Sequence, residues 1–219
     1  MPESDRKTET NEEIDRMEVI FAVILLIATV TSALCAYEAT RWSGDKNSLT
    51  ATSDSMTTES IRASNEANRQ ILVDVSVFLA WTEAKSENDT VRTGFIESRF
   101  TPQFKPAFEA WIAEAQGQPS GTIPPGTPFS LPQYNLSAQV RSEQLQENAT
   151  AVYNQAKLAG EISDRYLLNA VLFTIVLFLC SIGMRWKHDK IRRIILVSTT
   201  LFFILAISVF LWLPKISGF

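Results

Sequence analysis

The sequence predicts an all-α membrane protein with three transmembrane helices. The first two helices are expected to continue outside the membrane as an antiparallel helical-hairpin stalk with a small helical cap. Two observations predict this architecture. Three segments without charged residues, 19–37, 166–184 and 194–214, are each close to the ~20 residues that an α-helix needs to cross the hydrocarbon core. The polar insert between the first two, residues 38–165, begins and ends with proline-free stretches that lead directly into the spans.

The first span follows an acidic segment, residues 1–18. Acidic residues in this segment outnumber the basic residues Arg6, Lys7 and Arg16, which is the opposite of the basic start of a signal peptide. We therefore expect the first span to be retained as a membrane anchor. Thr10 and Glu13 have the spacing of a capping box, which favours a helix that begins near Thr10.

The orientation in the membrane is predicted by the short basic segment 185–193 between the second and third spans. Short loops rich in Lys and Arg remain in the cytoplasm. This places residues 1–18 inside, the insert 38–165 outside and the tail 215–219 outside. The residues that determine this topology are Arg185, Lys187, Lys190, Arg192 and Arg193.

Aromatic residues near the ends of the spans agree with this orientation. Trp and Tyr are enriched at membrane interfaces, where their rings are apolar and their polar groups reach water. In the predicted topology, Trp186 lies at the inner interface. The residues predicted at the outer interface are Tyr37, Trp42, Tyr166 and Trp212.

The stalk is predicted from a repeated spacing on two segments. Trp42, Leu49, Met56 and Ala63 recur every seven residues, and apolar residues of the returning segment 145–162 recur every three or four. Antiparallel helices pair residues whose numbers have a constant sum. This rule pairs Trp42 with Tyr166, Leu49 with Ala159, Met56 with Val152 and Ala63 with Leu145. Because small residues fit many registers, Trp42 and Met56 carry most of this prediction. Residues 48–60 are rich in Ser and Thr, which are mediocre helix formers.

The cap is predicted over residues 71–135. Its apolar opening, residues 71–81, is too short to cross a bilayer and indicates a buried helix segment. A second helix is expected to have Pro106 in its first turn and Gly117 at its C-terminal end. Its apolar stripe consists of Phe104, Phe108, Trp111 and Ile112. The proline-rich stretch that follows predicts an ordered or semi-rigid loop.

Several motifs together resemble a group of uncharacterised prokaryotic three-span membrane proteins. They are YEATRWSG, FIESRFTPQFKPAFEAW, TPFSLPQYNL and the basic loop. The group's versions read like A-Y-x-A-x-R-W-S-G and R-F-x-P-x-F-x-P-A-F-x-A-W, and the resemblance covers most of the chain. It implies the same architecture, the plasma membrane of a prokaryote as the location, and no particular catalytic residue.

No motif for catalysis, cofactor binding or metal binding was found in the sequence. The single histidine, His188, lies among solvated charges of the basic loop, whereas a metal site needs several convergent ligands. Glu83, Glu87 and Asp89 could hold calcium loosely, but their spacing is not that of a calcium loop and a solvated turn is expected. The acidic insert lacks a basic stripe, so nucleic acid is not expected as a partner.

Two classes of function remain compatible with the sequence. The first is a non-enzymatic scaffold, sensor or accessory subunit that acts through its external helical domain. The second is a homo-oligomeric channel in which the Ser/Thr-rich residues 48–60 line a wet vestibule. Besides membrane lipid, the expected partner is a second copy or a larger membrane complex, and no small-molecule ligand is indicated. Asn88, Asn135 and Asn148 begin glycosylation sequons that would be used only in a glycosylating host.

Overall fold

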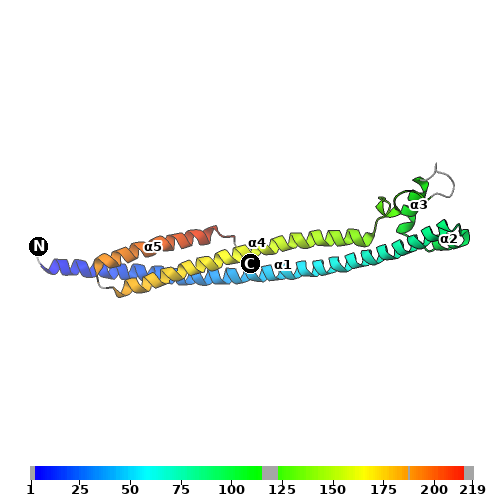
Figure 1. Cartoon of the computed structure of the whole chain (residues 1–219). Helices are drawn as coiled ribbons and strands as arrows, with labels where there is room; N and C mark the ends of the chain where they lie inside the picture. Colours follow the sequence, from blue (N-terminus) through cyan, green and yellow to red (C-terminus); the bar gives the residue numbers. More distant parts are fainter. Residues whose placement is uncertain (1–2, 115–122, 187, 215–219) are drawn as a thin grey trace. The chain divides into compact units, whose positions relative to one another are not determined.

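The computed structural model describes the backbone of residues 3–114, 123–186 and 188–214. Its elements are α1 (Glu3–Ser86), α2 (Thr90–Glu97), α3 (Phe104–Glu114), the short 3-10 helix η1 (Pro128–Ser130), α4 (Ser137–Arg185) and α5 (Asp189–Trp212) (Figure 1). None of the described residues is in a strand. Helices α1, α4 and α5 are each long and apolar enough to cross a membrane. The predicted class is therefore confirmed at this level: the described chain is all-α, with three helices that are each able to span a membrane.

Helix α1 continues without interruption from Glu3 through the first apolar segment and the Ser/Thr-rich residues to Ser86. It begins earlier than the capping signal at Thr10 predicts. The hydroxyls of Thr50 and Thr58 each donate to the backbone carbonyl four residues earlier, at 2.8 Å. Such bonds satisfy the hydroxyl groups without breaking the helix. The weak helix propensity of this stretch is thus outweighed by the contacts described below.

The chain divides into two compact units, and unit 1 consists of residues 1–51 and 152–219. Its core is formed by α1, α4 and α5, with the buried side chains Phe21, Cys35, Tyr166, Phe173 and Ala206 among its members. Large apolar side chains on the outside of the same helices, including Leu26, Phe178 and Leu201, are more than half exposed. A soluble protein rarely exposes so much apolar surface, whereas lipid solvates it. Unit 1 therefore has the surface of a membrane-embedded helix bundle.

Close contacts in unit 1 depend on small residues. A Cβ atom added to Gly183 of α4 would lie 2.7 Å from Cε1 of the buried Phe21 ring of α1. Glycine is therefore needed where the ring packs against α4. Further along the same two helices, Ser163 Oγ donates to the Ala39 carbonyl at 2.8 Å.

Unit 2 consists of residues 52–151, and in it a segment of α1 lies beside a segment of α4. Ser53 Oγ donates to the Ala149 carbonyl and Ser60 Oγ to the Ser142 carbonyl, both at 2.9 Å. Glu59 and Arg141 form an ion pair between the same helices. Ser60 follows Ser53 by seven residues and Ser142 precedes Ala149 by seven, so both bonds belong to one antiparallel register.

This register differs from the one predicted by the sequence. The constant-sum rule pairs Ser60 with position 148, but Ser60 bonds to Ser142, six positions earlier in α4. The partners of Ser53 and Ala39 are displaced by the same six positions. The fully buried line on α1 in unit 2 is Ser53, Ser60, Ala67 and Asp74, at the same sevenfold spacing. The predicted line is only half-buried at Leu49, Met56 and Ala63. The reason is chemical: serine hydroxyls that suggest a solvated face are instead buried, because each can donate to a carbonyl of the neighbouring helix.

An aromatic cluster closes the end of unit 2. Phe78 and Trp81 from α1 pack against Phe104, Phe108 and Trp111 from α3. The Trp81 and Phe108 rings meet edge to face with centroids 4.8 Å apart. Pro106 lies in the first turn of α3, where a missing N–H costs no helical hydrogen bond. Gly117, the predicted end of that helix, lies outside the described residues.

Candidate functional site

The candidate site lies at the end of unit 2, where the α1 end, α2 and α3 enclose the aromatic cluster. The two indole N–H groups of the cluster are satisfied. Trp81 Nε1 donates to Glu97 Oε1 at 2.8 Å, and Trp111 Nε1 donates to the Pro125 carbonyl at 3.3 Å. Since buried polar groups without partners are costly, these bonds fix the orientation of both rings. The cluster is therefore a rigid platform for the short helices around it.

Asp74 is a buried acid beside this cluster and is only 1% exposed. Its Oδ1 accepts a hydrogen bond from Thr101 Oγ1 at 2.7 Å, and its Oδ2 accepts one from Tyr134 OH at 3.0 Å. Thr101 Oγ1 also accepts from the Phe104 N–H, at the start of α3. One carboxylate thus connects α1 to the segments on both sides of the aromatic helix. Sequence reasoning missed this residue, although an acid inside the apolar stretch 71–81 was a usable signal.

This arrangement shifts the pKa of Tyr134. Burial raises the pKa of the Tyr134 phenol, and the hydrogen bond to Asp74 and the negative charge of Asp74 raise it further. The phenol therefore stays protonated as a donor well into the alkaline range. This geometry holds the segment before α4 in place, and it presents no activated nucleophile.

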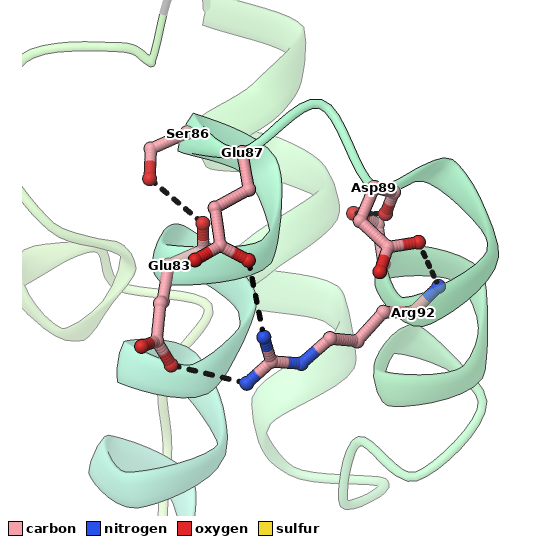
Figure 2. A network of polar contacts seen from close by, with 6 residues as sticks. Glu83, Ser86, Glu87, Asp89 and Arg92 are labelled. Carbon is pink, nitrogen blue, oxygen red and sulfur yellow. Dashed lines mark hydrogen bonds and ion pairs between the residues drawn. The ribbon is translucent and has the colours of Figure 1, made fainter.

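The acidic turn that could have held calcium is occupied by an arginine. Figure 2 shows the Arg92 guanidinium of α2 reaching back to the end of α1, where it bonds Glu83 at 3.1 Å and Glu87 at 3.2 Å. The Asp89 carboxylate instead caps α2 by accepting from the Arg92 backbone N–H at 3.0 Å. Among the described residues, no three His, Cys, Asp or Glu side chains lie together as a metal site would need. The turn works as a clamp for α2.

The outer surface of α2 carries exposed apolar side chains. Val91 is 83% exposed and Phe95, one turn later, is 61% exposed. The Arg99 guanidinium lies 5.3 Å from the centre of the Phe95 ring. Phe95 on α2 and Arg99 just beyond the end of α2 are of residue types that are enriched at protein interfaces, and Val91 adds exposed apolar surface beside them. We call Val91, Phe95 and Arg99 the α2 patch.

The aromatic residues predicted at membrane interfaces occupy different environments. Tyr37, Trp186 and Trp212 are exposed, as side chains in contact with lipid headgroups would be. Trp42 is half-buried in unit 1. Tyr166 is fully buried and its OH donates to the Pro214 carbonyl at 3.1 Å, so it joins α4 to the end of α5. Packing inside the unit is the main role that the structure gives Tyr166.

The basic residues between the last two spans are also not equivalent. Arg185, Lys190 and Arg193 have exposed side chains, and Lys187 lies outside the described residues. Arg192 is only 4% exposed and pairs with Glu18 of α1 at 3.3 Å. The basic segment is mostly helical, because α4 ends at Arg185 and α5 begins at Asp189. No pattern in the sequence distinguishes Arg192 as the residue that joins α5 to α1.

Comparison with models of known protein families, with curated proteins and with solved structures finds no significant match.

Proposed function

We propose that this chain is a non-enzymatic integral membrane protein that binds a second protein chain through an external helical domain. The observation that carries the proposal is the α2 patch, an exposed apolar face on a helix that ion pairs and a cap hold in one orientation. Rigid, pre-organised surfaces lose little entropy on binding, which favours affinity. A scaffold, a sensor or an accessory subunit would each use such a surface.

The proposal includes the finer arrangement of the chain. Spans 19–37 and 166–184 would extend into an antiparallel hairpin stalk, and the aromatic cluster of unit 2 would be its cap. Residues 1–18 and the basic segment 185–193 would lie in the cytoplasm, and residues 38–165 and 215–219 outside. The membrane would be the plasma membrane of a prokaryote. The basic segment supports this orientation through the positive-inside rule.

The alternative, a homo-oligomeric channel with a Ser/Thr-lined vestibule, has less support. Ser53 and Ser60 are buried and their hydroxyls bond to carbonyls of α4. The hydroxyls of Thr50 and Thr58 bond to carbonyls of their own helix. Side chains committed in this way offer few groups to a water-filled path. We therefore favour the binding module.

Site-specific photocrosslinking in cells tests the proposal. A benzophenone amino acid would replace Phe95 in one strain and Val140 in a second, because Val140 is an exposed apolar residue of α4 in the same unit. We expect a discrete crosslinked product from position 95 and none from position 140. A product of twice the chain's mass would identify a second copy, and any other discrete mass a different partner. Absence of a product at position 95, or equal products at both positions, would contradict the proposal.

A further inference from the structure

A pocket of about 530 Å³ lies between α4 and α5 within unit 1. Its volume falls within the range of about 300–1,000 Å³ that is usual for ligand sites. The residues of α4 on its wall are Arg165, Leu168, Asn169 and Leu172, and Val209 and Trp212 of α5 lie opposite. The Tyr166 bond to the Pro214 carbonyl holds the end of α5 beside it. The pocket is thus bounded by two helices of a fixed pair.

The pocket is polar at one end and apolar along its length. Arg165 directly precedes the uncharged segment 166–184. Leu172 lies seven residues after Arg165, which is about 10 Å along the helix axis. Leu168, Leu172 and Val209 line the part that lies within the apolar segments. Trp212, on the α5 side of the pocket, is 91% exposed and has an indole ring suited to the membrane interface. This order of chemistry matches a lipid, which has a charged headgroup above its acyl chains.

Arg165 has no acidic partner within ion-pair distance in the part of the chain that the structure describes. In the same part of the chain, Arg92, Arg141 and Arg192 do pair with glutamates. An arginine at the border of the hydrocarbon layer binds phosphate oxygens well, because its planar guanidinium donates two parallel hydrogen bonds. Its charge is therefore available for an anion from the membrane.

Asn169 supplies a second, independent indication of a ligand. It lies one helical turn below Arg165, is 1% exposed, and its Nδ2 donates to Cys35 Sγ at 3.5 Å. Its Oδ1 has no hydrogen-bond partner among the described residues. The two ends of an amide have the same shape, so a turned amide would accept from the Cys35 thiol and leave its NH2 group for another acceptor. An ester carbonyl of a lipid is such an acceptor.

We propose that this pocket binds one anionic phospholipid. The Arg165 guanidinium holds the phosphate, Asn169 bonds an ester carbonyl, and one acyl chain lies against Leu168, Leu172 and Val209. The inference rests on the membrane placement of α4 and α5 proposed above and is independent of any partner of the α2 patch.

Native mass spectrometry of the full chain, released from detergent, tests the site with three probes. They are phosphatidylglycerol, phosphatidylcholine with the same acyl chains, and inorganic phosphate alone. We expect one bound phosphatidylglycerol, weaker binding of phosphatidylcholine and no retained phosphate. Arg165→Gln should weaken phosphatidylglycerol binding about tenfold or more, the value of one charge-assisted bond. Ser208→Phe, which fills the pocket from α5, should weaken binding of both lipids.

The matched control is Arg41→Gln, because Arg41 of α1 also lies just beyond a span but not on the pocket wall. It should leave lipid binding unchanged. Equal losses from Arg41→Gln and Arg165→Gln would show only general attraction to the membrane and would overturn the site. So would phosphate binding without lipid, or unchanged binding in Ser208→Phe. Circular dichroism of each variant confirms that it is folded. Photocrosslinking at Phe95 would be unaffected by these variants, so failure of the lipid site and failure of the proposed function are distinguishable.

Discussion

Ser60 Oγ donates a hydrogen bond to the Ser142 carbonyl at 2.9 Å, and the two hydroxyl oxygens lie 3.1 Å apart. Both side chains are buried. Two helices can approach this closely only where side chains are small. A buried hydroxyl bond of this kind contributes about 1 kcal/mol and, because it must find its carbonyl, it also selects one register.

The register can be tested by disulfide crosslinking in a chain with Cys35→Ala and Cys180→Ala. Cysteines at Ser60 and Ser142 should form an intrachain disulfide under mild oxidation, which peptide mass spectrometry would detect. Cysteines at Ser60 and Asn148 should not, because six residues are about 9 Å of helix and disulfides rarely tolerate Cα separations above about 7 Å. A higher yield from Ser60 with Asn148 would restore the register predicted from the sequence.

Tyr134 should make the stability of unit 2 depend on pH in the alkaline range. Since its pKa in the folded chain is raised above the ordinary value near 10, the folded state holds the proton more tightly than the unfolded state does. The resulting stabilisation is complete below about pH 10 and is lost as the pH rises further. Melting temperature measured by circular dichroism should therefore fall above that pH.

The same experiment on Tyr134→Phe provides the decisive comparison. This variant should lose about 1 kcal/mol at neutral pH, because Asp74 loses one of its two hydrogen bonds, and its alkaline decline should be smaller. Tyr153→Phe is the control, since Tyr153 is more than half exposed on α4. An identical alkaline decline in wild type and Tyr134→Phe would show that Asp74 and Tyr134 are not coupled.

Gly183 should be intolerant of even one added methyl group. Gly183→Ala places a Cβ against the buried Phe21 ring and should cost about 1–3 kcal/mol, as overpacking of a core does. Gly44→Ala on α1 meets nothing within 4 Å and should be neutral or stabilising by up to about 1 kcal/mol, because alanine favours helices. Thermal unfolding in detergent compares the two. Equal effects would mean that Phe21 does not pack on Gly183.

Calcium should have no effect on unit 2. Arg92 already forms ion pairs with both Glu83 and Glu87, and Asp89 is committed to the cap of α2. The melting temperature should be the same in millimolar calcium and in chelator. Arg92→Gln should lose no more than about 1 kcal/mol, because the ion pairs are exposed. A calcium-dependent rise in the melting temperature of the wild type would show that the turn binds calcium and would contradict this prediction.

The parts of the fold that follow from local pattern were predictable. Long apolar segments indicate spans, and the stripe from Phe104 to Ile112 with Pro106 at its start indicates α3, because both signals depend only on nearby residues. The register of α1 against α4 was not predictable, because Ser53 and Ser60 are buried through hydrogen bonds to carbonyls of α4 that no sequence pattern identifies.

The candidate site, like the fold, was predictable only in part. An acid within an apolar stretch signals a buried carboxylate at Asp74, but its donors come from residues 27 and 60 positions away. Arg192 belongs to a segment whose charge predicts orientation, and counting charges does not show that Arg192 packs against Glu18. In both cases the missing information is which distant residues meet, and this is decided by packing.

The central claim is that residues 38–165 form the external binding domain of a three-span membrane protein. Cysteine accessibility in the Cys35→Ala and Cys180→Ala background tests it most directly. A cysteine at Val140, which is exposed on α4 in unit 2 and lies outside the α2 patch, should react with a membrane-impermeant maleimide in intact cells. A cysteine at the exposed His188, between α4 and α5, should react only after lysis. Labelling of position 188 in intact cells together with protection of position 140 would contradict the account.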